Sequence, residues 1–205
     1  MPKKVFYELD KEKQNRVIEA AIREFAEYGY AGGTTNRIIK ECGISKGSLF
    51  KYFENKEELY FYLIDLVTEQ REKAMKSEIE ELSRDLFKRA IGYSSAEFSW
   101  YAANPVRGRF LIAVASETDP GICGKIAERY GRKSEDVFRE IMKGVDMSGF
   151  RNEREEIINI LKWVLTGFNS NFRQSVAGRT DDLAVLQKEY VKQLKVYLKM
   201  LKKGL

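Results

Sequence analysis

Residues 44–59 read ISKGSLFKYFENKEEL and contain the starts of two successive helices. Asn55 is a favourable cap for the second of these helices, and Ser45 is a favourable cap for the first. The first helix nevertheless begins poorly, because Lys46 places a positive charge at the positive end of the helix dipole. Gly47 follows in the same turn and costs about 1 kcal/mol relative to alanine. The stability of the helix alone therefore does not explain Lys46 and Gly47.

The composition is that of a globular protein with a hydrophobic core, and it narrows the possible chemistry. Of the 205 residues, 43% are hydrophobic and 33% are charged, and the net charge of +5 permits an anionic partner without requiring one. The chain has no histidine, which removes histidine triads, histidine general bases and histidine metal sites. An enzyme could still work through carboxylates, lysine or a cofactor, but the missing histidines make catalysis less expected. We expect no enzyme activity, no metal site and no cofactor.

The sequence also favours a cytoplasmic protein with no membrane partner. No apolar run reaches the roughly 18–20 residues of a membrane span, and the first residues lack the apolar stretch of a signal peptide. Cys42 and Cys123 lie far apart and belong to no CxxC pair, which indicates two free thiols in a reducing compartment.

Apolar residues recur at three- and four-residue intervals along almost the whole chain, which predicts an all-α fold. The predicted helices are 11–28, 36–41, 45–50, 56–75, 82–103, 106–116, 121–143, 152–177 and 181–202. Short helices come first and longer ones follow. This change predicts an amino-terminal domain of residues 1–55 and a larger helical domain of residues 56–205.

The two shortest helices, joined by a turn that contains Gly43 and packed on the first helix, are typical of a helix-turn-helix. The second of them displays Lys46, Ser48, Lys51 and Tyr52, which supply cations and hydroxyl groups. A lysine at a helix start adds positive charge for a phosphate, and glycine beside it lets a DNA backbone come close. The alternative is that Lys46 is a solvated surface residue and that Gly47 is an accident of packing.

Residues 16–59 resemble the DNA-binding domain of the TetR family of bacterial transcriptional regulators. The resemblance rests on AAIREFAEYGYAGGTTNRI at 20–38 and CGISKGSLFKYFENKEEL at 42–59. The residues that match the family pattern are Phe25, Gly29, Tyr30, Thr34, Thr35, Ile38, Gly43, Ser45, Lys46, Gly47, Leu49, Tyr52, Phe53, Lys56, Glu57 and Leu59. The sequence departs from this pattern at Ile39 and Cys42, where alanine is usual, and at Phe50, where tyrosine is common.

The resemblance implies a set of DNA contacts on an operator of double-stranded DNA. Thr35 is expected to cap the second helix and to touch a phosphate, and Arg37 to reach a base edge or a phosphate. Lys46, Gly47 and Ser48 are expected to enter the major groove, with Lys46 suited to the two acceptors of guanine. The remaining residues, expected to hold the DNA backbone, are Lys51, Tyr52 and Lys56.

The resemblance also implies a carboxy-terminal helical domain that binds a small-molecule effector and forms a homodimer. The last two long helices have broad apolar faces, which suit a dimer interface. An aromatic-rich middle region suits a largely apolar ligand pocket, although aromatic residues at helical spacing also build cores. The candidates for this pocket are Trp100, Tyr101, Phe110, Trp163 and Phe168.

The function implied is therefore a ligand-responsive transcriptional repressor on a pseudo-palindromic operator. Two alternatives belong to other classes of protein. The first is an all-helical enzyme that uses carboxylates, for which Glu117 and Asp119 are the suggestive pair. The second is a helical adaptor that binds only protein, which would keep its function after Lys46→Ala and Lys51→Ala.

Overall fold

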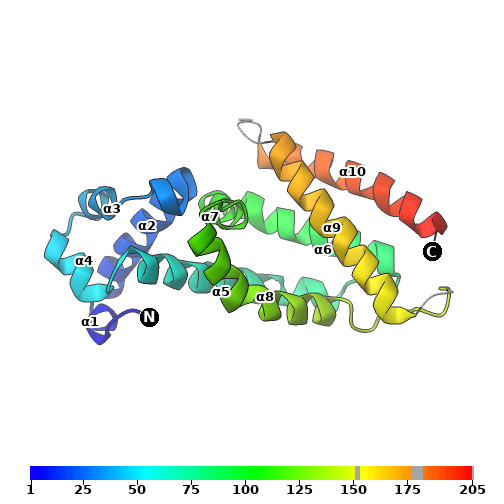
Figure 1. Ribbon diagram of the computed structural model, residues 1–205, viewed down its shortest axis with the longest axis horizontal. Coiled ribbons are helices and arrows are strands. Elements are labelled where there is room, and N and C mark those ends of the chain that lie inside the picture. Colours follow the sequence, from blue (N-terminus) through cyan, green and yellow to red (C-terminus); the bar gives the residue numbers. More distant parts are fainter. Residues whose placement is uncertain (151–152, 177–181, 205) are drawn as a thin grey trace. The chain divides into compact units, whose positions relative to one another are not determined.

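The structure, a computed structural model, describes residues 1–150, 153–176 and 182–204. All regular secondary structure in these ranges is helical, which confirms the all-α prediction. None of the described helices is both long enough and apolar enough to cross a lipid bilayer. In chain order the helices are α1 (Lys4–Tyr7), α2 (Lys11–Gly32), α3 (Thr35–Cys42), α4 (Lys46–Tyr52), α5 (Lys56–Glu80), α6 (Leu86–Ala103), α7 (Pro105–Ala115), α8 (Pro120–Ile141), α9 (Arg154–Val176) and α10 (Leu183–Gly204) (Figure 1).

The chain forms two compact units, and they are divided differently from the predicted domains. The amino-terminal unit comprises residues 1–74 and 104–124, and the carboxy-terminal unit comprises residues 75–103 and 125–205. The predicted boundary between residues 55 and 56 does not separate these units. The reason is that α7 packs along α2, so that a later part of the chain completes the amino-terminal core. A functional division at residue 55 stays a prediction.

Three aromatic rings from α2, α5 and α7 form the centre of the amino-terminal unit. Phe25, Tyr60 and Phe110 are fully buried, with ring centroids 5.0 Å apart for Phe25 and Tyr60 and 5.8 Å apart for Tyr60 and Phe110. At the edge of this core, Arg107 of α7 makes an ion pair with Glu19 of α2, and its Nε donates to Gln70 of α5 at 3.0 Å. These contacts hold α7 against α2 and α5.

Local sequence signals set the helix starts that position the helix-turn-helix. The carboxylate of Asp10 accepts a hydrogen bond from the N–H of Lys13 at 2.7 Å and caps α2. Asn55 does the same for the N–H of Glu58 at 2.8 Å and begins α5. Such caps satisfy backbone donors that have no partner within the helix. The cap predicted at Asn55 is therefore confirmed.

Two glycines with positive φ bend the chain on either side of α3. Gly29 has φ 63° inside α2, so the last turn of that helix is kinked away from the rest. Gly43 has φ 66° at the end of α3, which turns the chain toward α4. Only glycine adopts this left-handed conformation without strain. These two bends fix the direction of α3 and the start of α4.

The short helix α1 was not predicted. Its Phe6 is fully buried and lies 5.0 Å from the ring of Phe53 and 5.9 Å from that of Tyr52. The backbone N–H of Lys3 donates to the carbonyl of Tyr52 at 2.8 Å. The first residues therefore pack on the end of α4 and support the helix-turn-helix there.

The core of the carboxy-terminal unit lies among α6, the later part of α8, α9 and α10, where α10 packs against α6 and α9 (Figure 1). Arg89 is buried and donates to the carbonyls of Leu82 at 2.8 Å, Ser83 at 3.2 Å and Ile141. It thereby joins the start of α6 to the end of α8. The buried members of this core are Leu86, Phe87, Ala90, Ile141, Met142, Val145, Ile157, Leu161, Phe172, Tyr190, Leu194 and Leu198.

Two long helices differ from their predicted bounds. Helix α5 continues to Glu80, and α6 begins at Leu86 because Asp85 caps it by accepting from the N–H of Lys88 at 2.8 Å. The predicted helix ends at Asn152, Ala177 and Asp181 lie outside the described residues.

Candidate nucleic-acid interface

The helix-turn-helix consists of α3, the turn at Gly43 and α4, and side-chain caps begin both helices. Thr34 accepts from the N–H of Arg37 at 3.4 Å, and Ser45 accepts from the N–H of Ser48 at 3.2 Å. The prediction that Thr35 caps α3 is wrong by one position, because Thr34 is the residue with extended dihedrals before the helix. Thr35 is instead the first helical residue and is half-buried.

Helix α4 has an inward apolar face and an outward polar face. Leu49 is 1% exposed and belongs to the core, whereas Lys46, Gly47 and Lys51 are exposed and Ser48 is partly exposed. Neither lysine makes an ion pair or a hydrogen bond with any described residue. The outward face of α4 therefore presents two ammonium groups that the rest of the described chain does not use.

Gly47 is not required by packing inside the chain. A Cβ atom built at this position would have no described atom within 4 Å outside its own helical surroundings. Helix α4 has ordinary dihedrals here, with no positive φ. Packing within the described chain therefore gives no reason for glycine here, and the open space remains available to a partner.

Arg37 is engaged inside the amino-terminal unit. Its Nε lies 2.8 Å and 2.9 Å from the two oxygens of Glu24, and its Nη2 donates to the carbonyl of Gly32 at 2.6 Å. The guanidinium also lies 4.2 Å from the ring centroid of Tyr28. The hydrogen bond to Glu24 raises the pKa of Arg37 above its ordinary value. A base contact by Arg37 would require this arrangement to open.

The carboxylate of Glu24 has a structural reason to hold Arg37. The side chain of Glu24 is only 4% exposed, and a buried carboxylate is stable only when it is paired and hydrogen-bonded. Glu24 also accepts from the N–H of Thr34 at 2.6 Å. Arg37 and Glu24 together fix the entry to α3, a role for which the sequence offered no pattern.

Tyr52 and Lys56 do not present the free groups that were predicted to hold the DNA backbone. Tyr52 is 4% exposed, because its ring packs against Phe6. The ammonium of Lys56 donates to the carbonyls of Tyr30 at 2.8 Å and Gly33 at 3.2 Å. These contacts join the start of α5 to the end of α2. Both residues are therefore positioned as supports of the helix-turn-helix rather than as exposed contacts.

Two lysines near this face were missed. Lys40 is exposed on α3, and Lys3 donates from its ammonium to the carbonyl of Phe50 at 3.3 Å beside α4. The signal for Lys3 was present, since the apolar Phe6 lies in a charged segment and anchors that segment. The exposed cations of α3, α4 and the first residues thus include Lys3, Lys40, Lys46 and Lys51.

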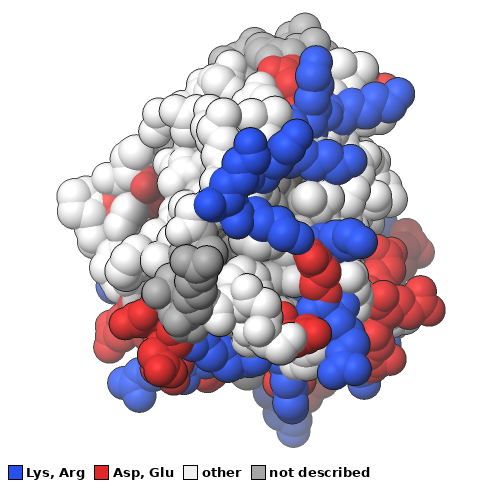
Figure 2. Space-filling view, turned by 90° about the vertical axis from the view of Figure 1, so that its right-hand side faces the viewer, with Lys and Arg blue, Asp and Glu red and all other residues white. Residues whose placement is uncertain are grey.

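Basic side chains are also numerous on elements other than the helix-turn-helix. Figure 2 shows a band of Lys and Arg side chains on the face it presents, where α10 carries a row of exposed lysines. Positive charge alone therefore does not identify a DNA-binding face. What distinguishes α4 is its position directly after the turn of the helix-turn-helix. The exposed lysines of α10 are Lys188, Lys192, Lys195, Lys199, Lys202 and Lys203.

The structure does not bring the five predicted effector-binding residues together. Phe110 is fully buried in the core of the amino-terminal unit, and Trp163 is 69% exposed on α9. Trp100 is 8% exposed beside Tyr101, with ring centroids 5.6 Å apart. Phe168 packs against the rings of Phe172, Tyr190 and Tyr197. These aromatic residues have different surroundings, and they do not line one common pocket.

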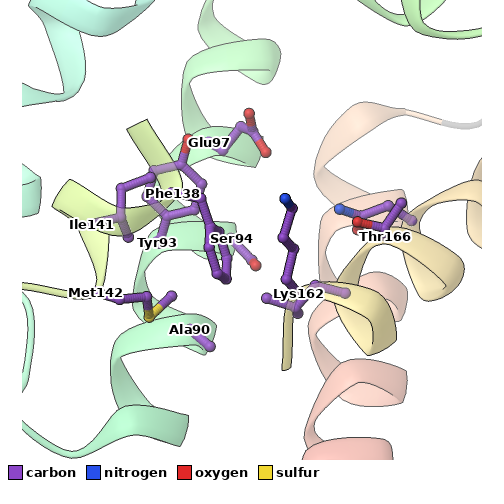
Figure 3. Close-up of a pocket in the computed structure, with 11 residues that line it drawn as sticks. Ala90, Tyr93, Ser94, Glu97, Phe138, Ile141, Met142, Lys162 and Thr166 are labelled. Carbon is purple, nitrogen blue, oxygen red and sulfur yellow. The ribbon is translucent and has the colours of Figure 1, made fainter. Parts of the chain in front are cut away.

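A cavity of about 210 Å³ lies instead within the carboxy-terminal unit, among α6, α8 and α9 (Figure 3). Its lining is largely apolar, with a few polar side chains, which is the usual character of a small-molecule site. The lining residues are Ala90, Tyr93, Ser94, Glu97, Phe138, Ile141, Met142, Lys162, Leu165, Thr166 and Asn169. None of the five predicted residues is among them.

Glu117 and Asp119, the suggested carboxylates of an enzyme, have structural partners. Asp119 accepts from the N–H of Ile122 at 2.9 Å at the start of α8. Glu117 accepts from the backbone N–H groups of Tyr30, Thr118 and Asp119. No group of three or more candidate metal-binding side chains occurs in the described part of the chain.

Comparison with known proteins agrees with this arrangement. Residues 17–63 match the family profile described as "Bacterial regulatory proteins, tetR family". The chain is 27% identical over 174 residues to the HTH-type transcriptional repressor AcnR of Corynebacterium diphtheriae, across 83% of this chain and 85% of that protein. It is 34% identical over 91 residues to the uncharacterized HTH-type transcriptional regulator YerO of Bacillus subtilis, across 42% of this chain but only 32% of YerO.

The fold also matches solved structures. A TetR family transcriptional regulator from Chloroflexus aurantiacus superposes with a TM-score of 0.66 over 100% of this chain and 98% of that one, at 20% identity. At this level of identity the match establishes a shared fold.

Proposed function

Because this chain belongs to the TetR family of bacterial regulatory proteins, we propose that it is a transcriptional repressor that binds an operator in double-stranded DNA and leaves it when a small molecule binds. The observation that carries this proposal is the outward face of α4, where Lys46 and Lys51 have no partner among the described residues. Since the proposed partner is chromosomal DNA, we also propose that the protein acts in the cytoplasm.

The proposed DNA contacts follow the accessibility of each side chain. Lys46, Gly47 and Ser48 enter the major groove, where base edges specify the sequence. Lys51, with Lys3 and Lys40 beside it, contacts phosphates and releases counterions. Thr35 remains a proposed phosphate contact at the start of α3.

A salt titration of operator binding tests this proposal. The DNA that flanks the protein's own gene is the first probe, and wild type is compared with Lys46→Ala. If Lys46 reads a base, the variant binds about 5- to 100-fold more weakly and discriminates less at one base pair. The control is Lys188→Ala, which removes an exposed lysine of α10 and is expected to leave affinity unchanged. A function that is retained after both Lys46→Ala and Lys51→Ala, with no binding of DNA by wild type, would favour a protein-only adaptor.

We propose that α9 and α10 form the homodimer interface. Trp163 of α9 is 69% exposed, and Val196, Tyr197 and Met200 of α10 are 49%, 52% and 64% exposed. Large apolar side chains in this number on two neighbouring helices are typical of an interaction surface. Gly167 lies one turn after Trp163 on α9, and a Cβ atom there would meet nothing within 4 Å. This open position suits the close approach of a partner helix.

Sedimentation analysis tests the dimer. Trp163→Glu places a charge on the proposed interface and is expected to yield monomers at concentrations where wild type is dimeric. Lys195→Glu, on the solvent face of α10, is the control with the same introduced carboxylate. A dimer that withstands both Trp163→Glu and Tyr197→Glu would place the interface elsewhere.

We propose that the effector occupies the cavity of about 210 Å³ among α6, α8 and α9. A ligand that binds one of two conformations more tightly shifts the population toward it, which is how an effector releases DNA. In this proposal residues 1–55 contact DNA and residues 56–205 receive the effector and form the dimer. Substitution of Phe138 by alanine, which enlarges the cavity, is expected to alter effector release without altering operator affinity in the absence of effector.

A further inference from the structure

We propose that the effector of this protein is a small organic carboxylate whose acid group binds Lys162 and whose apolar body fills the cavity between α6 and α8. This inference rests on the proposed function, because it names the chemical class of the ligand that the cavity receives. It is carried by the size of the cavity, by its apolar wall and by the position of one lysine on its rim.

The size of the cavity limits the ligand to a compact molecule. A cavity of roughly 150 Å³ lined by aliphatic and aromatic side chains holds one benzene ring, so the 210 Å³ here accommodate about one ring with a short chain. An extended chain of sixteen carbons does not fit in this volume. The structure therefore assigns a small acid rather than a long-chain fatty acid.

The wall of the cavity is apolar where α8 and α9 face α6. Phe138, Ile141 and Met142 come from the last turn of α8 and its end, and Leu165 comes from α9. Figure 3 shows the side chains of Phe138, Ile141 and Met142 on one side of the cavity and that of Lys162 on the other. Transfer of an apolar body to this wall is favourable in proportion to the area removed from water.

Among the described residues that line this cavity, Lys162 provides the only cation. Its ammonium lies 3.0 Å from the carboxylate of Glu135, and the hydrogen bond from Lys162 lowers the pKa of Glu135. The side chain of Glu135 is 57% exposed, whereas that of Lys162 is 34% exposed. A carboxylate from the ligand can therefore replace Glu135, which returns to water, while Lys162 remains paired throughout.

Two polar side chains of α6 face Lys162 across the cavity. Ser94 is 6% exposed overall and lines the cavity with its hydroxyl, which can donate a second hydrogen bond to the ligand's carboxylate. Glu97 lines the cavity farther along α6 and accepts from the hydroxyl of Tyr101 at 3.3 Å. Because Glu97 is also an anion, the competing ligand class is a small amine, and a test must separate the two.

Three probes with one apolar body and different head groups separate these classes. Phenylbutyrate, phenylbutanol and phenylbutylamine are titrated calorimetrically into the dimer of wild type, Lys162→Met and Lys162→Arg. We expect phenylbutyrate to bind wild type at least about tenfold more tightly than the alcohol, since a charge-assisted hydrogen bond contributes more than a neutral one. This preference is expected to vanish in Lys162→Met and to persist in Lys162→Arg.

The controls keep this inference separate from the proposed function. Lys188→Met removes an exposed lysine from α10 and is expected to bind phenylbutyrate as tightly as wild type does. Ser94→Ala is expected to weaken the binding of phenylbutyrate about three- to tenfold. The inference is overturned if phenylbutylamine binds wild type more tightly than phenylbutyrate does, if Lys162→Met binds phenylbutyrate as tightly as wild type does, or if no probe binds. Operator binding without ligand is measured on the same preparations, so that a failure to bind DNA counts against the proposed function alone.

Discussion

The carboxylate of Glu117, in the loop between α7 and α8, accepts a hydrogen bond of 3.2 Å from the backbone N–H of Tyr30, which lies 87 residues earlier in the chain. Its other oxygen accepts from the N–H groups of Thr118 at 2.9 Å and Asp119 at 3.0 Å. One side chain thus satisfies donors at the kinked end of α2 and in the loop. This is a structural use for a residue that the sequence suggested as a catalytic carboxylate.

Replacement of Glu117 by alanine is expected to lower the free energy of unfolding by about 1–3 kcal/mol, chiefly because it leaves the partly buried N–H of Tyr30 without an acceptor. Glu117→Gln keeps one acceptor oxygen and is expected to lose less. Urea denaturation followed by circular dichroism measures both, with Glu69→Ala on the exposed face of α5 as the control. A stability of Glu117→Ala equal to that of the control would contradict the role assigned to this loop.

The pair of Arg37 and Glu24 gives a second prediction, on stability rather than on base recognition. Arg37→Met is expected to destabilise the wild-type protein more than it destabilises Glu24→Gln, because only the wild type then retains a buried unpaired carboxylate. A double-mutant cycle of unfolding free energies measures this coupling. If Arg37 instead reads a base, Arg37→Lys would relax the sequence preference of the folded protein, which we do not expect.

Lys51 and Lys56 are five residues apart, and substitution by methionine is expected to affect the stability of the protein differently at the two positions. Lys56→Met removes donors to the carbonyls of Tyr30 and Gly33 and is expected to lower the unfolding free energy by about 1–2 kcal/mol. Lys51→Met removes an exposed ammonium and is expected to change stability by less than about 0.5 kcal/mol.

Operator binding separates the two lysines further. Lys51→Met is expected to reduce the slope of log affinity against log salt by about one, since one phosphate contact is lost. Each variant is the control for the other. A salt slope that changes only in Lys56→Met would reverse the roles assigned here.

Gly47→Ala is expected to stabilise the free protein by about 0.5–1 kcal/mol, because alanine favours the helix and the added methyl group meets no atom. The same change is expected to weaken operator binding, since DNA approaches this position in the proposed complex. Thermal unfolding and operator titration on one preparation measure both effects. A variant that is more stable and binds DNA as tightly as wild type would show that Gly47 faces only solvent.

Asp85 is expected to make stability depend on acidic pH. Its pKa is lowered chiefly by the hydrogen bond from the N–H of Lys88 and further by Lys202, whose ammonium lies 3.2 Å away. A lowered folded-state pKa means that the stabilisation is complete above the ordinary value of about 3.9 and is lost as the pH falls through the folded-state value.

Asp85→Asn keeps a cap for α6 but removes the charge. The difference in unfolding free energy between wild type and this variant is expected to be constant above about pH 5 and to shrink below about pH 4. Lys202→Met is expected to weaken this dependence without removing it, because the bond from Lys88 remains. Parallel pH profiles for wild type and Asp85→Asn would refute the assignment.

The parts of the fold that depend on neighbours in sequence could be predicted. Asp10, Ser45 and Asn55 each bond to a backbone N–H three residues later, so their effect is visible in a short stretch of sequence. Gly43 likewise marks a turn because only glycine is unstrained there. These signals located α2, α4 and α5 and the turn before α4. The exposure of Lys46 and Lys51 could be predicted because it follows from their positions on the polar face of one short helix.

The contacts between distant segments could not be predicted in this way. Phe110 follows the same helical periodicity as the aromatic residues of α6 and α9, yet it packs against Tyr60 within the amino-terminal unit. The sequence also does not show that Arg37 pairs with Glu24, or that the ammonium of Lys56 donates to two backbone carbonyls. The cavity is formed by α6, α8 and α9 together, so no local pattern identified Lys162.

In α4, the outward side chains and the inward side chains are different sets. The side chains of Lys46 and Lys51 bond to no other described residue, and that of Ser48 bonds only to the neighbouring cap Ser45 at 2.8 Å, whereas Leu49 and Tyr52 are buried. Substitutions at the three outward positions can therefore accumulate without unfolding the protein. Descendants of such a chain can change the DNA sequence they address while they keep the same scaffold, and recognition can diverge faster than architecture.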